Sequence, residues 1–95
     1  MPYRVELDQD TGLVDRLMGL PIEVQRTIHL ALQRLAENPT KLSVPAALPS
    51  PPGFQVYRFE HVDADGRSTP FAAYFQYGAD EQTLWVYEVR KEPPT

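Results

Sequence analysis

The chain contains no cysteine, few lysines and no long apolar run. The lack of cysteine excludes disulfide bonds, thiolate metal sites and cysteine catalysis, and it is typical of a cytoplasmic protein. Because no apolar run approaches the ~20 residues that cross a bilayer, we expect no membrane-spanning segment. The N-terminal sequence also lacks the apolar core of a signal peptide, so we expect a cytoplasmic protein.

Positive charge is scarce as well. Nine basic residues stand against thirteen acidic ones, which gives a formal net charge of −4. A protein that grips phosphate backbones without regard to sequence normally carries an excess of Lys and Arg. The composition therefore disfavours broad, non-specific nucleic-acid binding, although it is compatible with a local basic patch.

Proline, in contrast, is abundant, and six of the ten prolines lie in two segments. Four of them lie within residues 40–53, among small residues, and two more lie in the C-terminal tail. We predict that residues 40–53 form an extended connector without regular structure. With 95 residues in all, the chain is long enough for one domain, residues 1–95, with a thin two-layer core.

Three segments in the C-terminal half predict consecutive β-strands. Residues 54–61, 69–77 and 83–90 are rich in aromatic and β-branched side chains, which suit a half-buried pleated surface. Asp65-Gly66 lies in the first connection and is a strong hairpin signal. Because both connections are short, the three strands must form an antiparallel meander.

The same acidic turn superficially matches the start of a calcium-binding loop. Arg67 would stand at the fifth position of that loop and Tyr74 at its closing glutamate position, so the pattern fails. We expect no metal site and no cofactor.

The N-terminal half predicts one strand and two helices. Residues 3–7 alternate between apolar and charged side chains, which indicates a half-buried strand. A short helix is expected over residues 9–18, ending at Gly19. A longer helix is expected over residues 22–37, because its apolar residues recur at helical spacing and Pro39 follows it.

These elements give the order β-α-α-β-β-β. The simplest packing is an α+β fold in which the helical hairpin covers one face of a four-stranded antiparallel-type sheet. Strict alternation divides the last strand into two faces. One face would hold Leu84, Val86, Glu88 and Arg90, and the other Trp85, Tyr87 and Val89. We expect Arg58, Glu60, Glu88 and Arg90 together on the open face, provided that no bulge shifts the alternation.

Several motifs occur in a characteristic order. The chain begins with YRVEL, continues through LPIEVQRTIHLALQRLAENP and FQVYRF, and closes with LWVYEVR. In this order and spacing they resemble the RelE/ParE toxin superfamily, the toxin half of many bacterial type II toxin–antitoxin modules. The resemblance extends over residues 3–90 and implies the same β-α-α-β-β-β fold.

The resemblance also implies a function and a site. RelE-branch toxins enter the ribosomal A site and promote mRNA cleavage, in which a 2′-hydroxyl attacks the adjacent phosphate. Arg58 resembles the arginine of the family's first meander strand and Arg90 the arginine that closes its last strand. Both would stabilise developing charge, and His61 or Tyr74 would carry protons. The implied partners are an antitoxin that wraps the helices and sheet, and the ribosome with its mRNA.

The chain departs from the family's pattern at two points. The middle strand lacks the arginine of the usual Gly-x-Arg-x-x-Tyr pattern, so Arg67 in the hairpin would have to replace it. Lys91 and Glu92 follow Arg90 in place of the usual His or Tyr. Two alternatives therefore stand beside a ribosome-dependent endoribonuclease. One is a non-catalytic module of the same fold that binds a protein partner or itself as a homodimer, and the other is a ParE-like inhibitor of a protein target.

A further alternative concerns the arginines themselves. Arg58 and Arg90 could simply pair with Glu60 and Glu88 across the open face, contributing about 0–1 kcal/mol each if exposed. His61 could likewise be a solvent-facing residue at the end of a strand.

Overall fold

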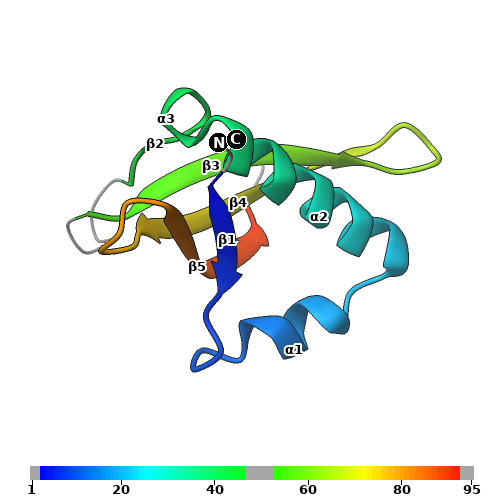
Figure 1. Cartoon of the computed structure of the whole chain (residues 1–95). Coiled ribbons are helices and arrows are strands. Elements are labelled where there is room, and N and C mark those ends of the chain that lie inside the picture. Colours follow the sequence, from blue (N-terminus) through cyan, green and yellow to red (C-terminus); the bar gives the residue numbers. More distant parts are fainter. Residues whose placement is uncertain (1–2, 47–52, 93–95) are drawn as a thin grey trace.

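A mixed β-sheet forms one layer of the protein, and helices cover one of its faces (Figure 1). The computed structural model describes residues 3–46 and 53–92. Within this part the sheet has five strands in the order β1-β5-β4-β3-β2. The strands are β1 (Arg4–Leu7), β2 (Val44–Pro45), β3 (Gln55–Val62), β4 (Ser68–Tyr77) and β5 (Thr83–Lys91). The helices are α1 (Leu13–Met18), α2 (Ile22–Glu37) and α3 (Pro39–Leu42).

Helix α2 has the bounds that the sequence predicts. Pro21 precedes it, and its missing N–H costs no hydrogen bond at this end of a helix. Its apolar stripe is buried against the sheet and comprises Ile28, Ala31, Leu32 and Leu35. This stripe holds the helix across the sheet.

Helix α1 begins later than residue 9, the start expected from the sequence. Gly12 adopts a left-handed conformation with φ of 74°, which interrupts a right-handed helix. The preceding residues instead follow β5, since the Asp8 N–H donates to the carbonyl oxygen of Val86 at 2.9 Å. The prediction of a helix over residues 9–18 was therefore wrong in its first turn.

The connector is more regular than predicted. Pro39 begins the short helix α3, and the Ser43 hydroxyl donates to the Pro39 carbonyl oxygen at 2.7 Å. Val44 then pairs with Val56, so β2 adds an antiparallel strand to the edge of the sheet. The prediction of a structureless connector was wrong for residues 40–45, and its residues 47–52 lie outside the described residues.

The α+β class is confirmed, but the sheet differs in two respects from the expected four antiparallel strands. It gains β2, and β1 runs parallel to β5, with Arg4 opposite Thr83 and Leu7 opposite Val86. A parallel pair needs a long connection, and most of the chain lies between these two strands.

A bulge in β5 changes which side chains face the helices. Tyr74 lies opposite Glu88 whereas Phe75 lies opposite Val86, so Tyr87 is an extra residue without a partner in β4. As a result Leu84, Val86 and Val89 all join the core beneath the helices. The expectation that strict alternation would separate Val89 from Leu84 and Val86 was wrong.

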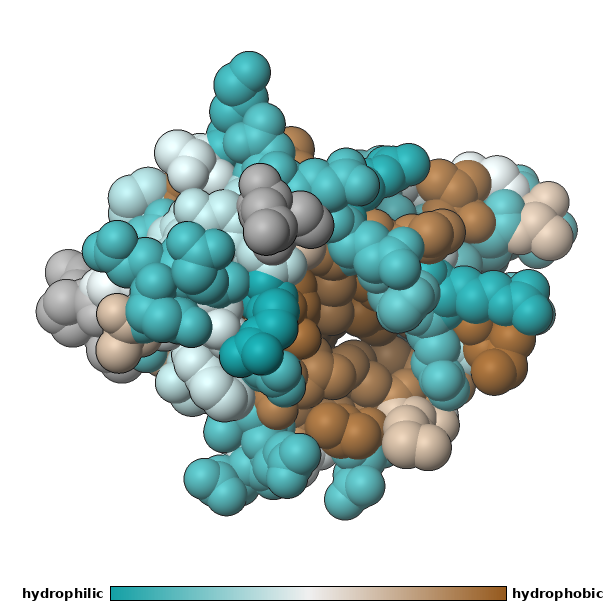
Figure 2. Space-filling model, in the orientation of Figure 1, coloured by the Kyte–Doolittle hydropathy of each residue, from teal (hydrophilic) through white to brown (hydrophobic). Residues whose placement is uncertain are grey.

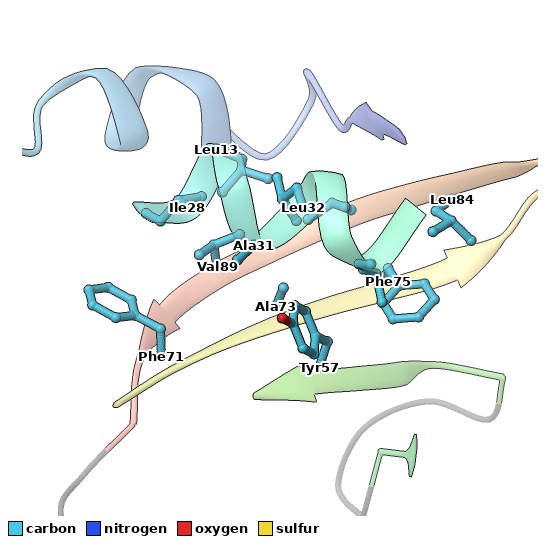
Figure 3. Close-up of a cluster of buried hydrophobic side chains, with 12 residues drawn as sticks. Leu13, Ile28, Ala31, Leu32, Tyr57, Phe71, Ala73, Phe75, Leu84 and Val89 are labelled. Carbon is cyan, nitrogen blue, oxygen red and sulfur yellow. The ribbon is translucent and has the colours of Figure 1, made fainter. Parts of the chain in front are cut away.

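The core lies between α1, α2 and the covered face of the sheet (Figure 3). Leu13 and the stripe of α2 meet Phe71, Ala73 and Phe75 of β4. Alternation then directs the neighbours of these β4 residues to the opposite, open face. None of the helices in the described part of the chain is both long and apolar enough to traverse a bilayer.

Candidate functional site

Two arginines lie in one row across three neighbouring strands of the open face. Arg58 of β3 is opposite Ala72 of β4, and Ala72 is opposite Arg90 of β5. Since neighbouring strands lie ~4.8 Å apart, the two arginine Cα atoms are about 10 Å apart. Ala72 between them is fully buried and has no side chain that could fill the space between the guanidinium groups. The bulge in β5 does not disturb this row, because it lies on the other side of Tyr74.

Tyr74 joins this row from the next outward-facing position of β4. One Arg90 nitrogen, Nη2, donates a hydrogen bond to the Tyr74 hydroxyl oxygen at 3.1 Å. The Arg90 guanidinium carbon also lies 4.9 Å from the centre of the Tyr74 ring, within the range of a cation–π contact. The structure therefore brings three of the four expected site residues together.

Glu92 is a further member of this cluster. Its Oε1 accepts a hydrogen bond from the Tyr74 hydroxyl at 3.2 Å and lies 3.9 Å from Nε of Arg58. We refer to Arg58, Tyr74, Arg90 and Glu92 as the arginine site. Sequence reasoning noted Glu92 only as a departure from the family pattern. Its spacing of two residues from Arg90 was the available signal, because residues i and i+2 of an extended chain share a face.

The surroundings of Arg90 favour its charged form. The hydrogen bond to Tyr74 and the nearby phenolic oxygen raise the pKa of Arg90, and the Glu92 and Glu88 carboxylates act in the same direction. Partial burial opposes this shift. Arg90 therefore stays a cation at any physiological pH.

The ion pairs differ from those expected across the open face. Arg58 pairs with Glu92 rather than Glu60, and Glu88 pairs with Arg16 of α1 at 3.0 Å rather than with Arg90. The Arg16 contact attaches α1 to β5. Arg16 also holds the Glu88 carboxylate, which we had expected beside Arg90 on the open face.

His61 lies on the other face of the sheet, apart from the arginine site. Its Nδ1 is 2.7 Å from the Thr27 hydroxyl of α2, in a partly buried hydrogen bond. This placement makes His61 a contact between helix and sheet and separates it from Tyr74.

Arg67 is also remote from the row. It lies in the hairpin between β3 and β4, which projects from the sheet (Figure 1). Its backbone N–H donates to the Asp63 carboxylate at 2.9 Å. Five residues separate it from Ala72, about 16 Å along the strand. The position three residues before Tyr74, where the family pattern has arginine, is occupied by Phe71, which is buried in the core.

An apolar groove runs between β1, α1 and α2, and Figure 2 shows apolar side chains around this hollow. Two adjoining hollows of about 160 and 310 Å³ share Leu7, His29 and Leu32 in their walls. Met18 lines the first hollow and is 70% exposed. We refer to these two hollows together as the apolar groove.

Solved structures with the same fold were found. The chain is similar to a chain of the toxin–antitoxin complex RelBE2 from Mycobacterium tuberculosis, with 17% identity, a TM-score of 0.71, and coverage of 97% of this chain and 100% of that one. It is also similar to the isolated E. coli RelE toxin, with 14% identity, a TM-score of 0.63, and coverage of 98% and 87%. A chain of the intact E. coli RelBE toxin–antitoxin complex matches with 16% identity, a TM-score of 0.61, and coverage of 97% and 99%.

The protein thus has the RelE fold over nearly its whole length, as the motifs predict. No protein-family model and no curated protein matches the sequence.

Proposed function

We propose that this protein is a RelE-like toxin of a bacterial toxin–antitoxin module and that it acts on translation by cleaving mRNA on the ribosome. The observation that carries the proposal is the convergence of Arg58, Tyr74 and Arg90 on the open face of a RelE fold. Cleavage of this kind requires cations beside a phosphate and a group that transfers protons, and the three side chains supply both.

The proposed chemistry needs no cofactor. The 2′-hydroxyl of a nucleotide gives up its proton and its oxygen forms a bond to the adjacent phosphorus. The bond from phosphorus to the 5′-oxygen breaks and this oxygen takes up a proton, so that a 2′,3′-cyclic phosphate and a 5′-hydroxyl result. Arg58 and Arg90 would stabilise the additional negative charge on the phosphate oxygens in the transition state. Tyr74, held by Arg90, is the best-placed proton carrier, and we assign no such role to His61 because it hydrogen-bonds to α2.

A cell-free translation assay with the purified protein tests this proposal. We expect the wild-type protein to block translation with mRNA cut on the ribosome. Loss of a charge-stabilising donor costs on the order of 10²–10³-fold in rate, so Arg58→Ala and Arg90→Ala should lose most of this activity. Arg67→Ala is the matched control, since it removes an arginine about 16 Å from the row, and it should act like the wild type. Translation that proceeds unaffected at high concentrations of the wild-type protein would refute the ribonuclease function.

The second part of the proposal is a protein partner, an antitoxin. Two features support it. The apolar groove exposes a continuous apolar surface of a kind that commonly marks a contact site. Beside it, β1 is an outer strand of the sheet, and such a strand can pair with a segment of another chain.

A non-catalytic interaction module of the same fold is the second candidate function. It is favoured by Glu92, whose carboxylate offsets part of the positive charge of the arginine site. A protein that binds its partner through the apolar groove, leaves translation intact and cuts no mRNA would fit this function. Gyrase inhibition would then test the related ParE-like activity.

A further inference from the structure

The side chain of Glu92 contacts Tyr74 and lies close to Arg58 in the arginine site. Its Oε1 accepts from the Tyr74 hydroxyl at 3.2 Å, and the same oxygen is 3.9 Å from Nε of Arg58. Tyr74 in turn accepts from Arg90 at 3.1 Å. One carboxylate oxygen is thus connected to both arginines, directly to one and through a phenol to the other.

The backbone fixes Glu92 in this position. The last paired residue of β5 is Lys91, opposite Phe71, and the Glu92 N–H continues the ladder by donating to the Pro70 carbonyl oxygen at 2.9 Å. The Glu92 side chain is only 20% exposed, whereas that of Arg58 is 61% exposed. The carboxylate is therefore held over the sheet rather than in free solution.

The charges of the site have a direct consequence for anion binding. Two guanidinium groups share one internal carboxylate, so an incoming phosphodiester meets one net positive charge rather than two. It would also compete with Glu92 for the hydrogen bond from the Tyr74 hydroxyl and for the charge of Arg58. The contact between Glu92 and Arg58 is long and partly exposed, and such pairs are weak. Displacement of Glu92 is therefore feasible under ordinary conditions.

We propose that Glu92 is an internal anion that occupies the arginine site until a phosphodiester of single-stranded RNA displaces it. The inference rests on the proposed function, because it takes RNA as the ligand. It adds an autoinhibitory contact within the chain itself, separate from any control by a partner protein. An acidic protein segment competing for the same arginines is the other outcome that the test addresses.

The test measures binding of a short, fluorescein-labelled, single-stranded RNA by anisotropy at a fixed ionic strength of about 0.15 M, where exposed charges are screened within about 8 Å. Glu92→Gln removes the charge and keeps an oxygen that can accept from Tyr74, so we expect roughly three- to tenfold tighter binding than for wild type. Glu60→Gln is the matched control. It removes the same charge from the same face, two residues from Arg58, where Glu60 lies opposite Pro70. It should bind within about twofold of wild type, because the Glu60 carboxylate is exposed and Arg58 pairs with Glu92 rather than with Glu60, and an exposed charge outside such a pair contributes little.

Two further variants test whether the gain in RNA affinity arises at the arginine site. The double variant Arg58→Ala/Glu92→Gln should not bind RNA more tightly than wild type, because the gain comes from Arg58 once Glu92 no longer pairs with it. Glu92→Ala should also bind more tightly than wild type, and thermal unfolding of each variant shows that it is folded. An equal gain for Glu60→Gln, or no gain for either Glu92 variant, would overturn the proposal. Absence of RNA binding by all variants, with binding of a poly-glutamate peptide instead, would overturn it in favour of an acidic protein ligand.

The binding assay separates this inference from the proposed function. If wild type blocks translation but Glu92→Gln binds RNA no better, the internal anion is refuted and the toxin function stands. If Glu92→Gln binds more tightly but no variant blocks translation, the ribonuclease function is refuted and the displacement stands.

Discussion

Asp80 organises the turn that joins β4 to β5. One carboxylate oxygen, Oδ1, accepts hydrogen bonds from the Gln82 N–H at 3.0 Å and the Thr83 N–H at 3.2 Å. The other, Oδ2, accepts from the Thr83 hydroxyl at 3.3 Å. These bonds stabilise a turn in which Glu81 takes a left-handed conformation with φ of 58°. A single side chain thus satisfies the donors at the start of β5, the strand that carries Arg90.

The turn predicts a pH dependence of stability. The hydrogen bond from the Gln82 N–H lowers the pKa of Asp80 below its ordinary value of 3.8, with further help from Thr83 and Arg4 and against partial desolvation. Because the folded state binds the proton less readily than the unfolded state, this contribution is complete above about pH 5. It is lost as the pH falls through the lowered pKa. Asp80→Asn should therefore lower the urea midpoint at pH 7, and this deficit should shrink at pH 3.

The control for this measurement is Asp10→Asn, which removes an exposed acidic residue ahead of α1. It should leave the urea midpoint nearly unchanged at both pH values. A deficit for Asp80→Asn that is the same at pH 3 and pH 7 would contradict the role assigned to the Asp80 charge.

Individual site residues were predictable to different degrees. Arg58, Tyr74 and Arg90 were identified from motif positions, and the structure brings them together because strand pairing aligns residues that alternation places on one face. His61 could not be placed in the same way. Its hydrogen bond to Thr27 depends on how α2 crosses the sheet, which local sequence does not specify.

At the level of elements, α2 is the most predictable part of the chain. Its apolar spacing, the proline before it and the Asn-Pro after it all indicate a helix over the same residues. Such agreement between local signals makes an element predictable from its sequence. The β5 bulge is the opposite case. An extra residue in one strand leaves no clear local signal, because it is defined by the partner strand. The parallel placement of β1 and the short β2 likewise depend on contacts between distant segments.

The placement of α2 predicts that alanine substitutions at two of its leucines differ greatly in their effect on stability. Leu35 is fully buried in the core, whereas Leu30 on the same helix is 56% exposed. Leu35→Ala should cost about 2–5 kcal/mol in the free energy of unfolding, because it removes apolar contacts and leaves a cavity. Leu30→Ala should cost less than about 1 kcal/mol. Urea denaturation measures both, and similar losses would contradict the placement of α2.

At the level of the whole molecule, the two proposed functional surfaces lie on different parts of the fold. The arginine site is on the open face of β3, β4 and β5, whereas the apolar groove lies between β1, α1 and α2. A partner bound in the groove would not need to touch Arg58 or Arg90. The proposed partner binding and the proposed RNA cleavage should therefore be separable by mutation.

This separation predicts the behaviour of a groove variant. We expect the wild-type protein to co-purify with the product of a small reading frame adjacent to its gene. Met18→Asp places a charge in the apolar groove and should weaken that complex by at least tenfold, because a buried unpaired charge is costly. Activity in cell-free translation should stay at the wild-type level.

Val62→Asp is the matched control. Val62 is an exposed apolar residue at the end of β3, in the projecting hairpin and away from the groove. This variant should retain the complex. If Met18→Asp binds the product as well as wild type does, or if Val62→Asp loses it equally, the groove is not the binding surface.

The pairing of β1 with β5 has a consequence for the order in which the protein becomes complete. The strand that joins the first part of the chain to the meander is the last of the described strands to be synthesised. Until Thr83–Lys91 emerges from the ribosome, β1 has no partner strand and β4 lacks one of its neighbours. Arg90 and Glu92 arrive at the same moment, so a nascent chain has neither the second arginine nor the carboxylate that occupies the site. Under the proposed ribonuclease function, such a chain lacks the complete site needed to cleave the mRNA that encodes it.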